Sequence, residues 1–190
     1  MKISEKGLET KAIAGSAPRG KSASEDASLG RDLLHSEKDL REHQIVLESI
    51  IRRLGKLGLE VKSTSRPSLL QLANIQHLHT SLLGEVDAGI HILDVLKELH
   101  PTPAVGGTPR EAACKHIPSL ESFDRGLYAA PIGWIDSKGE GEFVVGIRSA
   151  LIDGATATAF AGNGIVAGSD PEKELAETNW KLKALLENLL

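Results

Sequence analysis

Apolar residues recur at helical spacing in four stretches of the chain. The longest stretch follows Ser36, which with Asp39 forms a capping-box pattern, and Gly55 is expected to end that helix. The C-terminal stretch starts behind Asp170, with Pro171 at the first helical position. The predicted helices cover residues 37–54, 88–99, 109–122 and 171–188.

Segments with alternating or β-branched residues predict strands between these helices. The last three are separated by turns at 137–141 and 153–154, so we expect an antiparallel meander. Two segments are expected to be irregular: the Ser- and Gly-rich residues 16–30 and the Pro-rich residues 101–109. Residues 68–72 are ambiguous. The predicted strands cover residues 8–14, 58–65, 75–86, 127–135, 142–152 and 155–161. Helices together with antiparallel strands favour an α+β fold.

Composition narrows the classes of function. The net charge is −4 and aromatic residues make up 3% of the chain, so neither a basic footprint nor a stacking platform for nucleic acid is expected. No apolar run approaches 18 residues, so no membrane span is expected. The lone Cys114 favours a reducing compartment, and residues 1–6 do not resemble a secretory signal. We therefore expect a cytoplasmic protein, or a plastid one in a plant or alga.

Two pairs of carboxylates stand at helix starts. Asp39 and Glu42 are three residues apart at the start of one predicted helix, and Glu174 and Glu177 are three apart at the start of another. Each pair flanks the apolar stripe of its helix, which directs it toward whatever the stripe packs on. Acids at these positions also offset the helix dipole, so a capping role stays open beside a site for a hard divalent cation.

Three further features carry candidate chemistry. The Gly-rich residues 161–169 precede the last helix, so they form either an anion-binding loop or an ordinary strand-to-helix turn. They match neither the glycine pattern of dinucleotide-binding loops nor that of Walker loops. His77 and His79 share a strand face, yet no third zinc ligand follows at a suitable spacing. Arg148 follows an apolar run, so it is either a carboxylate-binding group or an exposed charge at a strand end.

Six motifs in this order resemble the chorismate-utilising enzymes, with isochorismate synthase as the most similar branch. They lie in residues 14–20, 36–43, 76–78, 99–109, 123–129 and 161–172. The family fold stacks two antiparallel sheets with helices outside. Its reaction in this branch transposes a hydroxyl of chorismate with Mg²⁺, so the resemblance implies an isomerase of menaquinone, siderophore or salicylate biosynthesis.

The resemblance also assigns residues. Ala104 stands where ammonia-adding members carry Thr, which is similar to the isochorismate branch. The metal ligands it implies are Asp39, Glu42, Glu174 and Glu177. The residues it implies for chorismate or isochorismate are Gly15, Ser16, His77, Ala104, Tyr128, Arg148, Gly162 and Lys181.

The resemblance leaves two groups of the family unmatched. Its general base is a Lys and its general acid is the Glu of a Ser-Pro-Glu motif, and both precede the position where the match begins. Residues 1–190 are therefore expected to be the C-terminal portion of a chorismate-binding domain without its N-terminal half. Such a chain is expected to be inactive alone, with the N-terminal half as a separate partner chain. A non-catalytic chorismate-binding remnant and a salicylate synthase remain alternatives.

Overall fold

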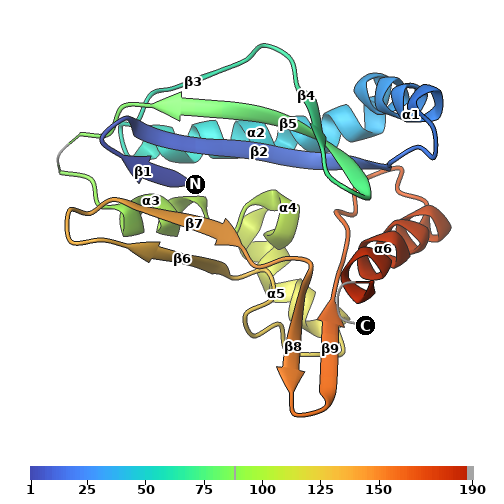
Figure 1. Cartoon of the computed structure of the whole chain (residues 1–190). Coiled ribbons are helices and arrows are strands. Elements are labelled where there is room, and N and C mark those ends of the chain that lie inside the picture. Colours follow the sequence, from blue (N-terminus) through green and yellow to red (C-terminus); the bar gives the residue numbers. More distant parts are fainter. Residues whose placement is uncertain (88, 188–190) are drawn as a thin grey trace.

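The computed structural model describes residues 1–87 and 89–187, and it is built from one large antiparallel sheet, one separate hairpin and surrounding helices (Figure 1). The strand order of the large sheet is β3-β5-β2-β1-β7-β6, with β4 also paired to β5. Its strands are β1 Lys2–Ser4, β2 Gly7–Pro18, β3 Val61–Ser63, β4 Ser68–Gln71, β5 Ile75–Gly84, β6 Pro131–Ile135 and β7 Gly141–Val145. The hairpin is β8 Ser149–Asp153 with β9 Thr156–Phe160. The predicted α+β class with antiparallel sheets is confirmed.

Among residues 1–87 and 89–187, six helices surround the strands. They are α1 Ala23–His35, α2 Glu37–Lys56, α3 Ile92–Leu99, α4 Pro103–Gly106, α5 Arg110–Leu120 and α6 Pro171–Leu186. No helix among the described residues is both long and apolar enough to cross a bilayer.

The core lies between α2 and the sheet (Figure 1). Leu8 and Ala12 alternate along one face of β2, and Ile50 and Leu54 recur along α2, so the two apolar faces meet. The buried apolar residues are Ile3, Leu8, Ala12, Ala14, Val46, Ile50, Leu54, Leu59, Leu82, Ile92, Val95 and Leu99. The start of α2 follows the predicted cap, since Ser36 Oγ accepts a hydrogen bond from Asp39 N.

Residues 16–30 are not the irregular loop that their composition predicts. β2 continues to Pro18 and α1 begins at Ala23. The short turn between them is fixed by Asp26, whose two carboxylate oxygens accept hydrogen bonds from Arg19 Nε and Nη2 at 2.8 and 2.7 Å. Leu33 is the buried apolar anchor of α1. One such anchor is too weak a periodic signal to predict a helix from sequence.

The Pro-rich segment is also more regular than predicted. Pro103–Gly106 forms the single turn of α4, with Pro103 at a position where a missing N–H costs no helical hydrogen bond. Pro109 precedes α5 as its N-cap, where the sequence predicts Thr108 as the cap, and Pro118 lies inside the helix. The predicted helix 88–99 begins at Ile92. Residue 88 and residues 188–190 of the last predicted helix lie outside the described residues.

The predicted meander is wrong, because the strand expected over residues 142–152 is two strands in different sheets. β7 pairs with β6 and β1, whereas β8 pairs with β9. The chain turns between them at Gly146, whose backbone oxygen accepts a hydrogen bond from Ala129 N and whose N–H donates to the backbone oxygen of Ala130. Arg148 then adopts a left-handed backbone with φ of 49°. A continuous apolar run in the sequence conceals this break.

Candidate active site

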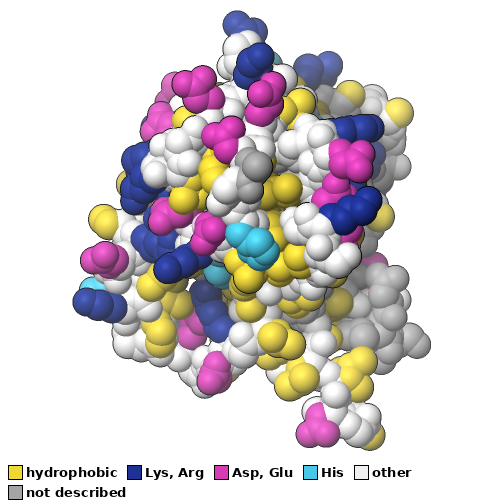
Figure 2. Space-filling view, turned by 90° about the vertical axis from the view of Figure 1, so that its left-hand side faces the viewer, with side chains coloured by type: hydrophobic (Ala, Val, Ile, Leu, Met, Phe, Trp, Pro, Cys, Tyr) yellow, Lys and Arg dark blue, Asp and Glu magenta, His cyan; other side chains and the backbone are white. Residues whose placement is uncertain are grey.

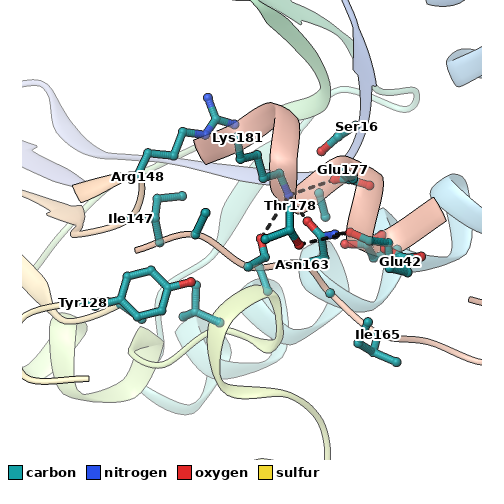
Figure 3. Close-up of a pocket in the computed structure, with 18 of the residues that line it drawn as sticks. Ser16, Glu42, Tyr128, Ile147, Arg148, Asn163, Ile165, Glu177, Thr178 and Lys181 are labelled. Carbon is teal, nitrogen blue, oxygen red and sulfur yellow. Dashed lines mark hydrogen bonds and ion pairs between the residues drawn. The ribbon is translucent and has the colours of Figure 1, made fainter. Parts of the chain in front are cut away.

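A cavity of about 420 Å³ lies where the end of β2, the start of α2, β5, the loop before α6 and α6 itself meet (Figure 3). Of the residues proposed from sequence, those lining it are Gly15, Ser16, Glu42, His77, Ala104, Tyr128, Arg148, Gly162, Glu174, Glu177 and Lys181. Asp39 lies just behind the wall, where its Cβ is 3.0 Å from the position that a Cβ on Gly15 would take. Residues from both ends of the chain thus converge on one space.

His77 lies on β5 opposite Ser16, across a bulge in β2 at Gly15. Gly15 has φ of +78°, a conformation that favours glycine, and the bulge places Ser16 Oγ 2.9 Å from His77 Nδ1. Arg148 Nη2 donates to His77 Nε2. Because a guanidinium only donates, Nε2 is the accepting nitrogen, and Nδ1 carries the proton that is donated to Ser16.

The surroundings of His77 keep its ring neutral. Burial, together with the smaller effect of the charges of Arg148 and Lys181, lowers its pKa to about 4. His79, on the same strand, lies beside Ser68 with Nδ1 3.3 Å from Oγ, and it does not line the cavity. Of the two histidines, only His77 therefore belongs to the lining of this cavity.

Arg148 is half-buried at the wall of the cavity rather than an exposed charge at a strand end. Burial lowers its pKa, and the nearby Glu177 carboxylate raises it in part. Its bond to His77 uses one terminal nitrogen, which leaves other guanidinium N–H groups for an anion in the cavity.

The two acid-bearing helix starts lie side by side. Lys38 on α2 donates to Glu174 Oε1 on α6 at 2.5 Å, and Glu174 is only 6% exposed. Lys181 lies 2.8 Å from Glu177 Oε1 and also donates to Asn163 Oδ1 at 2.6 Å, as Figure 3 shows. Glu174 and Glu177 are therefore each paired with a lysine.

Glu42 has no such ion pair with a lysine or arginine among the residues that the structure describes. Its pKa is raised to about 7 by burial and by the charges of Glu177 and Asp39, against smaller lowering from the two lysines. Gly164 lies against it, since a Cβ there would meet Glu42 Oε1 at 2.6 Å. Asp39 accepts a hydrogen bond from Ser36 Oγ. Excess negative charge therefore collects at this end of the cavity.

This cluster fits a hard divalent cation by the chemistry of its donors, which are all carboxylate oxygens. A cation would also relieve the repulsion that raises the pKa of Glu42. As the side chains stand within residues 1–87 and 89–187, no three His, Cys, Asp or Glu residues gather closely enough to hold a metal ion.

The opposite wall carries aromatic rings. Tyr128 is stacked on Phe160, with centroids 5.4 Å apart and an interplanar angle of 18°. Its hydroxyl lies beside Gly162, where a Cβ would come within 2.9 Å of the oxygen. Ala104 on α4 completes this part of the lining. The phenol thus faces the same space as Arg148.

Sequence reasoning missed three polar residues at the site. Thr178 Oγ and Asn163 Nδ2 both donate to the backbone oxygen of Glu174, the former at 3.0 Å. Asn163 lies within the Gly-rich motif, so the sequence could have indicated that it belongs to the site. The sequence gives no indication that Lys38 pairs with Glu174, because the two residues are 136 positions apart.

Comparison with known proteins identifies the family of this chain. The profile of the family described as chorismate binding enzyme matches residues 1–190. Isochorismate synthase MenF of Bacillus subtilis (strain 168) is 45% identical over 177 residues, which are 93% of this chain and 38% of that protein. The salicylate biosynthesis isochorismate synthase of Pseudomonas aeruginosa is 48% identical over 181 residues, which are 95% of this chain and 38% of that protein.

A solved structure has the same fold. DhbC from Bacillus anthracis superposes with a TM-score of 0.94 at 37% identity, over 99% of this chain and 50% of that one. The chain thus spans between about two fifths and one half of the length of these relatives. With the family profile matching from the first residue to the last, the chain belongs to the chorismate-binding enzyme family.

Proposed function

We propose that residues 1–190 are the C-terminal portion of an isochorismate synthase domain, which binds chorismate and takes part in its Mg²⁺-dependent conversion to isochorismate. The observation that carries the proposal is a single cavity with Arg148 at one wall and the carboxylates of α2 and α6 at another. Cationic and anionic walls suit a dicarboxylate ligand bound directly at one end and through a cation at the other.

The chain's own residues would bind and orient the ligand. Arg148 would donate to one carboxylate, with the Tyr128 hydroxyl beside it. His77 would hold Arg148 in place through its neutral Nε2. Lys181, which already donates to Asn163 and to the Gly162 oxygen, would also donate to the ligand. Ala104, which offers no hydroxyl to position an ammonia nucleophile, is consistent with water as the nucleophile of the isochorismate branch.

Glu42, Glu174, Glu177 and Asp39 would hold Mg²⁺. The ion would neutralise a substrate carboxylate and charge developing near it. For these residues to ligate the ion, Lys38 must release Glu174 and Lys181 must release Glu177, because one carboxylate oxygen of each accepts from a lysine.

Proton transfer needs groups beyond those described. Both nitrogens of His77 are engaged, Lys38 and Lys181 are each paired with a carboxylate, and Glu42 is in the metal cluster. A general base and a general acid each contribute roughly 10²–10⁴-fold to such reactions. Because the family resemblance places the general base and the general acid before the matched residues, we propose that a second polypeptide segment, the N-terminal part of the domain, supplies both.

Exposed apolar surface supports such a partner. β1 pairs with β2 only as far as Glu9, and a groove of about 610 Å³ lies between β2 and β7, lined in part by Ile13, Phe143 and Ile147. In the β8–β9 hairpin Leu151 and Ile152 are 63% and 65% exposed. Figure 2 shows hydrophobic side chains on the projection at the bottom of the molecule. Unpaired strand edges and apolar patches of this kind favour association.

The test is reconstitution. The chain is co-purified with the part of Bacillus subtilis MenF that lies outside the matched segment, and chorismate and Mg²⁺ are added. Isochorismate by chromatography is the expected product, and Arg148→Met in the reconstituted pair is expected to abolish it. A complex that forms without turning over chorismate would contradict the catalytic proposal, and salicylate as product would indicate the salicylate synthase reaction.

Binding by the chain alone decides the remaining alternative. Calorimetric titration with chorismate and Mg²⁺ is expected to show binding that Arg148→Met weakens, with Arg66→Met, an exposed substitution away from the cavity, as the control. Binding without activity in any reconstituted pair would favour a non-catalytic chorismate-binding protein.

A further inference from the structure

We propose that Arg125 is a positioning residue, which holds the turn of Ala104 and Val105 at a fixed separation from the Tyr128 ring and thereby sets the affinity of the cavity for its ligand. The inference rests on the proposed function, because chorismate is the ligand considered.

Arg125 joins two segments that are separate in sequence. Its Nε and Nη2 donate to the two carboxylate oxygens of Glu121, at 2.8 and 2.6 Å. Its Nη1 donates to the backbone oxygen of Val105 at 2.8 Å. Glu121 caps the end of α5, and Val105 belongs to α4 beside Ala104. The guanidinium therefore fixes α4 against the end of α5.

The same side chain borders the aromatic wall. Arg125 Cζ lies 5.6 Å from the centroid of the Tyr128 ring, and Tyr128 N donates to Arg125 O at 2.7 Å. Phe160 stacks on this ring and Gly162 lies beside its hydroxyl, so the phenol has little room to move. Displacement of Arg125 would remove one of these boundaries.

The arrangement differs from an ordinary surface ion pair. The side chains of Arg125 and Glu121 are 29% and 25% exposed, and both line the cavity that contains Ala104 and Tyr128. A bidentate fork together with a third bond to a separate element is a geometry that Arg provides and Lys does not. A purely electrostatic role would be restored by Lys, whereas a positioning role would not.

The chain offers a clean spectroscopic probe, because Tyr128 is its one tyrosine. Burial raises the pKa of this phenol, and the charge of Arg125 lowers it in part. Titration of phenolate absorbance therefore reports the contact with Arg125 without any ligand. The methyl NMR resonance of Ala104, assigned by its loss in Ala104→Gly, reports the position of α4.

The experiment compares Arg125→Lys and Arg125→Met with the control Arg66→Met. We expect both Arg125 variants to shift the Ala104 methyl resonance and to weaken chorismate binding by about tenfold, the effect of losing one charged hydrogen bond. Arg125→Met should also raise the pKa of Tyr128 further, whereas Arg125→Lys should keep it closer to that of the wild type. Arg66→Met should change none of these.

Wild-type affinity or an unmoved Ala104 resonance in Arg125→Lys would overturn the proposal. If wild-type protein does not bind chorismate, the proposed function fails, and the two ligand-free readouts alone decide the positioning role. If Arg125→Met does not fold by circular dichroism, Glu121→Gln removes the charge of the partner with almost no change of shape. It is expected to shift the Ala104 resonance in smaller measure, and an unmoved resonance would overturn the proposal. The pKa of Tyr128 should fall in this variant, because the charge of Glu121 raises it.

Discussion

At the scale of single residues, the charge of the cavity depends on which polar side chains already have hydrogen-bond or ion-pair partners. The neutral ring of His77 lies between Arg148 and Ser16, and Glu42 stands among carboxylates without a close cation. The pKa of His77 is lowered and the pKa of Glu42 is raised, so both shifts favour the neutral form of the side chain. Each leads to a testable prediction.

The buried His77 predicts acid sensitivity. The unfolded chain takes up its proton near pH 6.5 and the folded chain only near 4, so the free energy of unfolding should fall as the pH falls through that range. Between pH 7.5 and 5 the loss from this group should be about 2 kcal/mol. Urea unfolding at both pH values checks this. His77→Gln should show a smaller loss, and an equal loss in both proteins would contradict the assignment.

Glu42 predicts opposite effects of one substitution on stability and on metal binding. Glu42→Gln removes a charge repelled by Glu177 and Asp39, so without metal at pH 8 the variant should be more stable by about 1–2 kcal/mol. Stabilisation by added Mg²⁺, seen as a rise in Tm in the wild type, should be lost. Glu48→Gln, at an exposed position of α2, is the control and should retain the Mg²⁺ effect.

At the scale of elements, the bulge of β2 and the start of α2 together shape one wall. Gly15 combines a positive φ with close contact to Asp39, and this allows Ser16 to face His77. The site therefore depends on a backbone irregularity that no helical or strand period indicates.

Replacement of this glycine tests the dependence. Gly15→Ala is expected to destabilise the protein by about 2–3 kcal/mol, from its left-handed backbone and from crowding against Asp39. Gly58→Ala is a matched control, because its φ is +76° with nothing within 4 Å of the added Cβ, and it should lose only about 1–2 kcal/mol. Equal losses in thermal unfolding would show that the contact with Asp39 is unimportant.

At the scale of the whole molecule, the large sheet and the hairpin expose surface that a single chain of this length does not cover. The apolar side chains of β8 and β9 and the groove beside β2 are the main examples. Association is therefore coupled to the proposed activity, because the same partner would fill the groove and complete the proton-transfer machinery.

This predicts that a hairpin variant separates assembly from folding. The double substitution of Leu151→Lys and Ile152→Lys should weaken co-elution with the N-terminal part of Bacillus subtilis MenF on sizing chromatography. Its own unfolding midpoint should change little, since both side chains are exposed. The control Ile51→Lys, on the exposed side of α2, should co-elute like the wild type. Undiminished co-elution of the double variant would place the contact elsewhere.

The sequence by itself determined the α+β class, the long helix behind Ser36 and the family, because periodicity, caps and ordered motifs are local properties. It also indicated the residues of the cavity, through their places in those motifs. Only the tertiary structure decided the pairing of Lys38 with Glu174, the break of the predicted meander at Gly146, and the contact of Arg148 with His77. Those depend on contacts between residues far apart along the chain, and such contacts leave no periodic trace in a single sequence.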